Sequence, residues 1–319
     1  GSRVLDAATD RGYSTDTCGF HRGGIGAAME GYLPRPLIMV STTNFCDGKP
    51  KVYELLSSYY GREFILIDVP HKRDVSAVDY VSRQLENSIL RIERATGLKF
   101  NERKFHDHIS NFNKMTGYLE RIDELKKHSP CPFEGDRAYR FQFPLFLLWG
   151  TGTSVKLCEN LYNELKRKID SGVSSRENIR LLWMGVFPNY KTEIFTTLRK
   201  KYHARIVCHE YCHMGIERID EDDPFNGLAR RLVNSWLLGP VENRIEHALQ
   251  LVKEYGCHGV IHHSHWGCRH TMGGLGSLRE AFLDRGIPFL NLDMDGMDES
   301  NYFPGQVKTR IESFMEMFQ

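Results

Sequence analysis

Short apolar runs alternate with segments of helical period along most of this 319-residue chain. The runs at 36–42 (PLIMVST) and 63–70 (EFILIDVP) are rich in β-branched and other apolar residues and are flanked by Gly or Pro, which predicts buried strands. Between them, the segment KPKVYELLSSYYG carries its apolar residues on one helical face and ends at Gly61. Residues 36–70 therefore predict a β-α-β unit with parallel strands.

The same alternation returns from residue 178. The clearest helix of the chain is predicted at 241–256, where apolar residues form a single stripe. Further strands are predicted at 179–186, 204–210, 258–264 and 287–293, and further helices at 192–203, 275–286 and from Gln306 onward. Strands that alternate with helices in this way indicate a second unit with a parallel sheet.

The segment from Asp74 to about Ser129 is long, charged and of helical period throughout. Its charge runs are typical of a solvated helix face. We therefore predict an α/β fold with two doubly wound, Rossmann- or flavodoxin-like domains at 1–73 and 178–319, and a helical insert with a connecting segment at 74–177. Gly1-Ser2 resembles a cloning remnant, so we expect the first domain to be truncated at its N-terminus.

Composition and charge exclude several classes of protein. The 42 basic and 41 acidic side chains are finely mixed and give a net charge of +1, which offers no general attraction for nucleic acid or an anionic membrane. We find no apolar run near the roughly 18 residues of a spanning helix, and no signal peptide. Eight cysteines are too sparse for a disulfide scaffold in a chain of this length, so we expect reduced thiols and a cytoplasmic location.

Three cysteines share a distinctive setting. Cys46 follows the predicted strand 36–42, and Cys268 follows strand 258–264, at the strand ends where parallel sheets bind ligands. Cys18 lies in a Gly-rich turn. Each has a glycine close by and a nearby cation (Arg22, Lys49 and Arg269, respectively), and cations stabilise thiolates or a negatively charged cluster. Without Cys-x-x-Cys pairs, spacing alone leaves a shared three-cysteine cluster and unrelated free thiols both open.

Other candidate sites receive a structural interpretation. Cys208, His209, Cys212 and His213 form a compact group that zinc would accept, but its geometry after a strand is undefined, and we favour a structural role. Cys131, Cys158 and Cys257 are typical of core or loop thiols. His262 and His263 are adjacent on a strand and must point to opposite faces, while His265 lies nearer the strand end.

Two further patterns are weaker indications of a site. Gly23-Gly24-Ile25-Gly26 resembles a phosphate-binding loop but lacks the Gly-Lys-Ser/Thr ending and the Rossmann spacing. Asp293, Asp295 and Asp298 follow the last strand, where magnesium ligands or turn formers are expected, and we favour turn formers.

The stretches CGFHRGG, STTNFCDGKPKVYELL, GVIHHSHWGCRHTMGG and GQVKTRIESFMEM together resemble the 2-hydroxyacyl-CoA dehydratase and benzoyl-CoA reductase family, in its D-component-type iron–sulfur subunit. The resemblance implies that Cys18, Cys46 and Cys268 hold a [4Fe–4S] cluster between the two domains, with one iron left open. It also implies an ATP-hydrolysing iron–sulfur activator protein as electron donor, and a homodimer or a heterodimer with a related subunit.

The resemblance leaves two branches of the family. The stretches HWGCR, LDMDGMD and GQVKTRIE are more similar to the double-cubane branch, whose sulfide-bridged [8Fe–9S] cluster reduces small molecules. The other branch comprises 2-hydroxyacyl-CoA dehydratases and aryl-CoA reductases, which act on CoA thioesters.

The leading hypothesis is an oxygen-sensitive iron–sulfur reductase or dehydratase subunit. Arg22 and Arg269 would stabilise negative charge, and His21 or His265 would supply protons; these roles are inferred from proximity in sequence. Two hypotheses from other classes stay open: a non-catalytic partner subunit that stores electrons, and a zinc-binding α/β protein.

Overall fold

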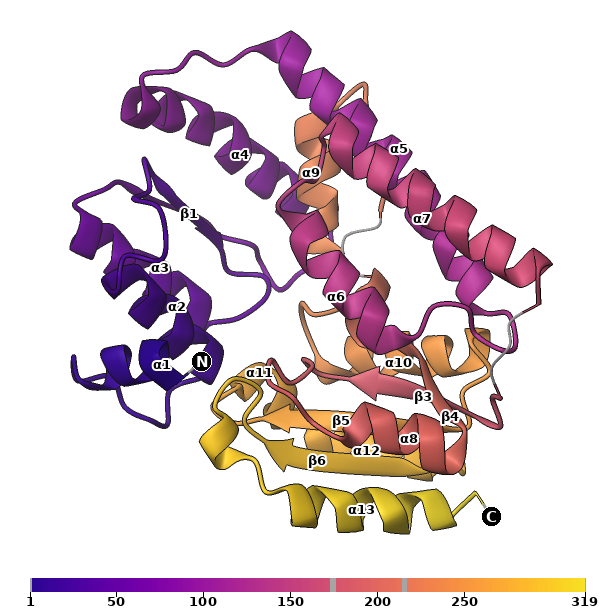
Figure 1. The fold of residues 1–319 in the computed structure, drawn as a ribbon. Coiled ribbons are helices and arrows are strands. Elements are labelled where there is room, and N and C mark those ends of the chain that lie inside the picture. Colours follow the sequence, from indigo (N-terminus) through magenta and orange to yellow (C-terminus); the bar gives the residue numbers. More distant parts are fainter. Residues whose placement is uncertain (1, 173–175, 214–216, 319) are drawn as a thin grey trace. The chain divides into compact units, whose positions relative to one another are not determined.

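The computed structural model describes residues 2–172, 176–213 and 217–318, except for the side chain of His213. The chain forms two compact units (Figure 1). The first unit comprises Gly1–Ser110 and Glu217–Asn243, and the second comprises Asn111–Ile216 and Arg244–Gln319. Both contain parallel strands among helices, which confirms the predicted α/β class. The predicted division at residues 73 and 177 stays a prediction.

The first unit is built on a β-α-β element, as the apolar pattern predicts. Strands β1 (Met39–Thr42) and β2 (Phe64–Ile67) pair in parallel, and α3 (Gly48–Tyr60) connects them. Helix α3 ends where Gly61 takes a left-handed conformation with φ 60°, which a glycine adopts without strain. The predicted strand–helix–strand order is confirmed.

Helices surround these two strands. Ile65 and Ile67 of β2 pack with apolar residues of α4 (Val75–Thr96) and α9 (Pro224–Val233). The side chain of Asp74 caps α4 by accepting a hydrogen bond from Ala77 N at 2.9 Å. The sequence did not reveal α9, which joins this unit from far along the chain. Besides α3, the first unit contains α1 (Ser2–Thr9), α2 (Gly19–Met29), α4, the first part of α5 (Glu102–Lys126) and α9.

The second unit contains a four-stranded parallel sheet in the order β4-β3-β5-β6. Its strands are β3 (Ile179–Met184), β4 (Ala204–His209), β5 (Gly259–His265) and β6 (Phe289–Met294). The chain begins at β3, adds β4 on one side, and then returns to add β5 and β6 on the other. The order reverses between β3 and β5, and ligands of such sheets bind outside the carboxyl ends of the strands at that point.

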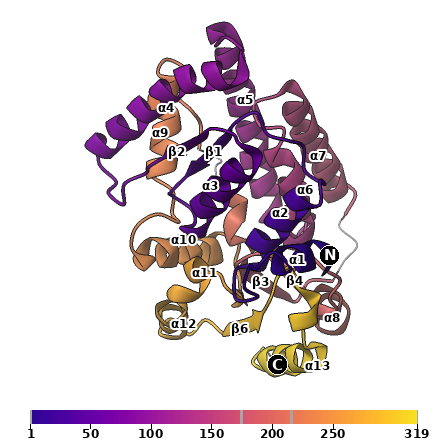
Figure 2. The ribbon, with the colours of Figure 1, turned by 90° about the vertical axis from the view of Figure 1, so that its left-hand side faces the viewer.

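Helices cover both faces of this sheet (Figures 1 and 2). One face packs against α8 (Ile194–Tyr202) and α13 (Pro304–Glu316), and the other against α10 (Val241–Glu254) and α12 (Leu275–Leu283). All seven residues of β5 are buried, as expected for a strand enclosed on both faces. The second unit is therefore doubly wound, as predicted.

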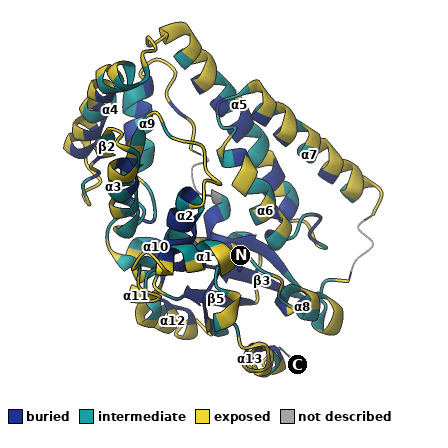
Figure 3. Cartoon of the chain, turned by 60° about the vertical axis from the view of Figure 1, so that its left-hand side comes forward, coloured by how far each residue is buried: buried dark blue, intermediate teal, exposed yellow. Residues whose placement is uncertain are grey.

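The other helices of the second unit lie outside this three-layer core. They are the rest of α5, α6 (Gly135–Phe146), α7 (Gly152–Asp170), the short η1 (Glu210–His213), α11 (Arg269–Gly273) and η2 (Glu299–Asn301). Helices α5 and α7 each bury one side and expose the other, and for α5 this confirms the solvated face predicted within residues 74–129 (Figure 3). Of the helices described, none is both long enough and apolar enough to cross a membrane.

Candidate functional site

Two of the three singled-out cysteines lie at the N-terminal ends of consecutive helices in the first unit. Cys18 is the N-cap residue of α2, and Cys46 comes two residues before α3. The Sγ atom of Cys46 lies 3.8 Å from Nε2 of His21, in the first turn of α2. Gly48 permits this approach, because a Cβ atom there would lie 2.6 Å from the His21 ring. The structure thus brings Cys46 against the helix that Cys18 begins.

The surroundings of this cysteine pair favour negative charge. Free backbone N–H groups and the helix dipole stabilise a thiolate at a helix N-terminus. Lys49, in the first turn of α3, donates a hydrogen bond to Thr42 Oγ1 at 3.0 Å; burial lowers the pKa of Lys49, and the charge of Cys46 opposes that shift. Burial also lowers the pKa of His21, against the opposing charge of Asp47, so the imidazole is neutral at pH 7.

The cation predicted to serve Cys18 makes a hydrogen bond to the neighbouring helix α1. Arg22 is buried, and its Nη1 donates to Thr9 Oγ1 of α1 at 3.3 Å. Its proposed part in stabilising negative charge stays a prediction.

The Gly-rich stretch after Cys18 is helix, in agreement with its being only a weak indication of a phosphate-binding loop. Gly23, Gly24 and Gly26 all lie inside α2. A Cβ atom on Gly26 would come within 1.7 Å of the carbonyl oxygen of Val4. This glycine is therefore required for the close packing of α1 on α2.

The third cysteine lies at the carboxyl end of a central strand of the second unit. Cys268 follows β5 and is the N-cap residue of α11. Its N–H donates to the carbonyl of His265 at 3.0 Å, and its own carbonyl accepts from Met272 N at 3.1 Å. Gly267 makes the turn with φ 74°. Cys268 thus occupies the sheet edge where the strand order reverses.

The histidine and arginine that flank Cys268 differ in exposure. His265 is 1% exposed, and its Nδ1 accepts a hydrogen bond from Gly296 N at 2.8 Å, so the proton of the neutral ring is on Nε2. Asp295 Oδ1 lies 3.6 Å from the same Nδ1. Arg269 is exposed on α11. The proposed proton-donor and charge-stabilising roles of these two residues stay predictions.

A buried ion pair underlies the loop that carries Cys268. Arg244 of α10 binds both carboxylate oxygens of Glu210, at 2.9 and 2.8 Å, and both residues are almost fully buried. Glu210 also accepts a hydrogen bond from Gly185 N at the end of β3. Arg244 donates in addition to the carbonyl of Thr271 in α11, at 3.2 Å. This arrangement ties β3, β4 and α10 to the helix that Cys268 begins.

The network continues onto the two remaining strands. His262 Nε2 lies 3.3 Å from Nη2 of Arg244, and its Nδ1 lies 2.9 Å from Asn291 Oδ1 on β6. Since Arg244 only donates and the amide oxygen of Asn291 only accepts, His262 is neutral with its proton on Nδ1. Burial, followed by the charge of Arg244, lowers the pKa of His262 to about 4. Arg244 in turn outweighs burial at Glu210 and holds the pKa of that carboxyl below its ordinary value.

Sequence reasoning missed Glu210 and Arg244. The available indications were an arginine within the predicted helix 241–256 and a glutamate that ends the predicted strand 204–210. Neither reveals that the two side chains meet, because they are 34 residues apart in sequence.

Gly185 provides a direct test of this sheet edge. Its φ is 83°, and a Cβ atom would lie 2.4 Å from the carbonyl oxygen of His263. We expect Gly185→Ala to lower the free energy of unfolding by about 1–3 kcal/mol, from backbone strain and from displacement of the N–H that serves Glu210. Urea unfolding followed by circular dichroism measures this loss. The exposed Gly276→Ala, where a Cβ has open space, is the control, and equal stability of the two variants would contradict the expectation.

The neighbouring polar residues have structural roles. His263 points to the opposite face from His262, as predicted: its ring nitrogens lie 2.5 and 3.0 Å from the carbonyl oxygens of Val186 and Met294. The interpretation as turn formers is confirmed for Asp295 and Asp298, whereas Asp293 lies within β6 and accepts a hydrogen bond from Trp266 Nε1 at 2.7 Å. Asp295 Oδ1 accepts from the N–H groups of Met297 and Asp298, and Asp298 caps η2.

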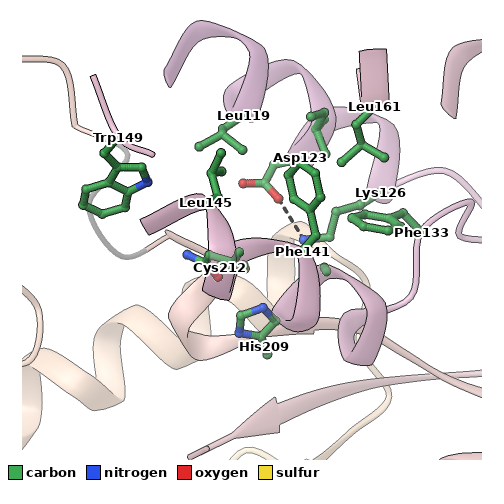
Figure 4. A pocket seen from close by; sticks show the side chains of 13 residues that line it. Leu119, Asp123, Lys126, Phe133, Phe141, Leu145, Trp149, Leu161, His209 and Cys212 are labelled. Atoms are coloured by element: carbon green, nitrogen blue, oxygen red, sulfur yellow. Dashed lines mark hydrogen bonds and ion pairs between the residues drawn. The ribbon is translucent and has the colours of Figure 1, made fainter. Parts of the chain in front are cut away.

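Two members of the group that zinc would accept line a cavity of about 40 Å³ (Figure 4), whereas the side chain of His213 lies outside the described residues. His209 and Cys212 face it together with Lys126, whose Nζ is 2.8 Å from Asp123 Oδ1. Burial opposes charge on Lys126, but Asp123 and the nearby thiols outweigh it and raise its pKa. A fixed ammonium repels a divalent cation. Among the described residues no three His, Cys, Asp or Glu side chains gather to hold a metal ion.

The thiols interpreted as core residues are buried. Burial raises the pKa of Cys131 to about 11 and that of Cys158 to about 12. The pKa of Cys208, whose Sγ lies 3.8 Å from that of Cys257, also rises well above its ordinary value. Protonated, enclosed thiols of this kind are inert. Their structural interpretation is confirmed.

Together, these features define a doubly wound α/β protein with cysteines at helix N-termini and strand ends. The family model for the 2-hydroxyglutaryl-CoA dehydratase D-component matches residues 1–318, so the chain belongs to this family of dehydratases and reductases. This confirms the resemblance found in the sequence.

Individual relatives agree with this assignment. The chain is 24% identical to the (R)-phenyllactyl-CoA dehydratase alpha subunit of Clostridium sporogenes, over 99% of this chain and 80% of the relative. It is 24% identical to one of the subunits of the benzoyl-CoA reductase of Thauera aromatica, with the same two coverages. It is 23% identical to the (R)-2-hydroxyglutaryl-CoA dehydratase subunit alpha of Acidaminococcus fermentans, over 90% of this chain and 61% of the relative.

Proposed function

We propose that this chain is an oxygen-sensitive iron–sulfur subunit that takes part in the reduction or dehydration of a CoA thioester. In this proposal Cys18, Cys46 and Cys268 supply the three thiolate ligands of a [4Fe–4S] cluster. Such a cluster, when bound, supplies one iron with an open coordination position and low-potential electrons for the substrate. The observation that carries the proposal is the placement of all three cysteines at helix N-termini in a chain that matches the family throughout.

The chain's own groups fit this donor set. Cys18 and Cys46 lie at helix N-termini, where the helix dipole and backbone N–H groups stabilise negative charge on thiolates and sulfides. The Nε2–H of His265 is held in one tautomer three residues before Cys268 and would donate a proton. Arg269, exposed on α11, would stabilise negative charge on the substrate. An ATP-hydrolysing activator protein would deliver the electrons, and a related subunit or a second copy of the chain would complete the dimer.

The relatives' names favour CoA thioesters as substrates, since they refer to phenyllactyl-CoA, benzoyl-CoA or 2-hydroxyglutaryl-CoA. The double-cubane branch is the second candidate, and the stretches HWGCR, LDMDGMD and GQVKTRIE favour it. A sulfide-bridged [8Fe–9S] cluster would contain sulfide in excess over iron, so the ratio of the two separates these candidates.

The first experiment is to purify the chain without oxygen and to measure iron, sulfide and zinc per chain. We expect about four irons with matching sulfide. Most of both should be lost in Cys268→Ser, because Cys268 is one of only three thiolate ligands proposed for the cluster. Cys212→Ser, which changes a half-buried thiol outside the proposed set, should keep its iron. Zinc without sulfide, lost in Cys212→Ser and kept in Cys268→Ser, would overturn the proposal.

A second measurement addresses the electron-storing alternative. The purified chain is mixed with an activator ATPase, ATP, a reductant and an acyl-CoA substrate. Turnover by the chain alone would assign catalysis to it. Turnover only after addition of an unlike subunit, together with a reducible cluster in this chain, would make it the storage partner.

A further inference from the structure

A cavity of about 480 Å³ lies at the carboxyl end of β3, inside the second unit. This volume is within the range of about 300–1,000 Å³ that small-molecule sites occupy. One wall is a stripe of α6 that includes Tyr139, Arg140 and Phe143, and the other is the loop Phe187–Lys191 that follows β3. We call it the Tyr139 pocket. Its place beside the point where the strand order reverses is where doubly wound sheets bind ligands.

Aromatic rings form the body of the Tyr139 pocket. The ring centroid of Tyr139 is 4.8 Å from that of Phe187 and 6.0 Å from that of Phe143. Phe187 is almost fully buried and stacks on Trp183, whereas Phe143 is 54% exposed. The pocket therefore combines a fixed aromatic wall with an exposed ring on which a planar group can stack.

The rim of the pocket is cationic. Arg140 and Lys191 are exposed, and among the described residues neither has an ion-pair partner. The one carboxylate in the lining, Asp136, pairs with Arg199 at 3.3 Å, which leaves the two rim charges uncompensated. Unpaired cations beside exposed aromatic surface suit a ligand with a planar ring and phosphate groups.

The loop that forms this pocket is connected to the Cys268 region through hydrogen bonds. Tyr190 Oη donates to the carbonyl of Asp295 at 2.5 Å, and Asn189 N donates to the carbonyl of Gly296 at 2.7 Å. Gly296 N in turn donates to His265, three residues before Cys268. All three hydrogen bonds are made by the backbone of residues 295–296, so a ligand in the pocket is held on the same rigid sheet edge as Cys268.

We infer that the Tyr139 pocket binds an adenine nucleotide carrying phosphates, and that in this chain the nucleotide is the 3′-phosphorylated end of a CoA thioester. The inference rests on the proposed function for its choice of CoA. Adenine would stack on Phe143 and Tyr139, and the phosphates would meet Arg140 and Lys191. Free ADP or ATP shares this chemistry and is the alternative source.

Calorimetric titration of the full chain, purified without oxygen, with CoA tests the inference. We expect Arg140→Gln and Lys191→Gln each to weaken CoA binding about tenfold or more, the effect of one lost charge-assisted hydrogen bond. Phe143→Ala should weaken it about tenfold through lost stacking. The matched controls are Arg137→Gln and Lys200→Gln, exposed cations on α6 and α8 outside the pocket lining, which should leave the affinity unchanged.

Titrations with three other ligands show whether the bound nucleotide is part of CoA or a free adenine nucleotide. Pantetheine, which lacks the nucleotide, should bind without sensitivity to these variants, and dephospho-CoA should bind more weakly than CoA. ADP that binds as tightly as CoA, with the same dependence on Arg140 and Lys191, would overturn the assignment to CoA in favour of a free-nucleotide site.

The remaining outcomes separate this inference from the proposed function. CoA binding that is equal in all variants would overturn the pocket assignment, while the iron and sulfide contents would still decide on the cluster. Absence of CoA binding by the unaltered chain at millimolar concentration would overturn both the pocket and the CoA substrate, again without affecting the metal analysis.

Discussion

Replacing Arg244 with methionine is expected to lower the free energy of unfolding by about 3–5 kcal/mol, because the substitution leaves the carboxylate of Glu210 buried and without its bidentate partner. Methionine fills much of the volume of the arginine stem, so the loss reports the charge rather than a cavity. The change also removes the donor to the carbonyl of Thr271 and loosens α11. Urea unfolding followed by circular dichroism, at pH 7, measures the loss.

Two further variants show whether the buried charge is the cause. Arg279→Met changes an exposed arginine of α12 and should alter stability by no more than about 0.5 kcal/mol. The double variant Glu210→Gln with Arg244→Met removes both charges and should recover part of the loss, since an unpaired buried charge costs more than a buried neutral pair. A loss in Arg244→Met no larger than in Arg279→Met would contradict this account of the network.

The apolar pattern predicted the strands of both sheets, because the residues that each strand buries are close together in the sequence. Strand β5 reads as a continuous apolar and histidine run, and α10 carries its stripe within one predicted segment. The placement of Cys46 and Cys268 after strands followed from the same pattern. Sequence order alone did not indicate that α9 returns to the first unit, because its contacts with α4 join segments more than a hundred residues apart.

The candidate site was predicted less completely than the fold. The selection of Cys18, Cys46 and Cys268 depended on the family resemblance, since their spacing matches no compact ligand motif. The Gly-rich segment gave only a weak indication, because glycine serves close helix packing as well as phosphate-binding loops, and only the position of Val4 distinguishes the two. The network of Glu210, Arg244 and His262 could not be predicted, because it forms only where residues from the four strands of the second unit and from α10 come together.

Acidification provides the second large effect, which originates at His262. The pKa of this residue is about 4 in the folded protein and about 6.5 in an unfolded chain, because burial disfavours the charged ring and a second proton on Nε2 would also face the guanidinium of Arg244. Between these values the unfolded chain binds more protons than the folded one, so stability falls as the pH falls. We expect the free energy of unfolding to decrease by about 3 kcal/mol from pH 7 to pH 4 on account of this residue.

Other buried groups act in the same direction, so a matched variant is needed to isolate His262. Because the pKa of Glu210 is lowered in the folded protein, stability is lost as the pH falls below about 4.5, the pKa of this carboxyl in the unfolded chain. The lowered pKa of His263 also costs stability as the pH falls, beginning near the unfolded histidine pKa of about 6.5. His262→Gln keeps a donor and an acceptor but does not titrate. Unfolding of this variant, measured from pH 7 to pH 4, should lose about 3 kcal/mol less than the unaltered chain, whereas the exposed His106→Gln should retain the full loss. Equal pH dependence in all three proteins would show that Arg244 and burial do not hold His262 in its neutral form.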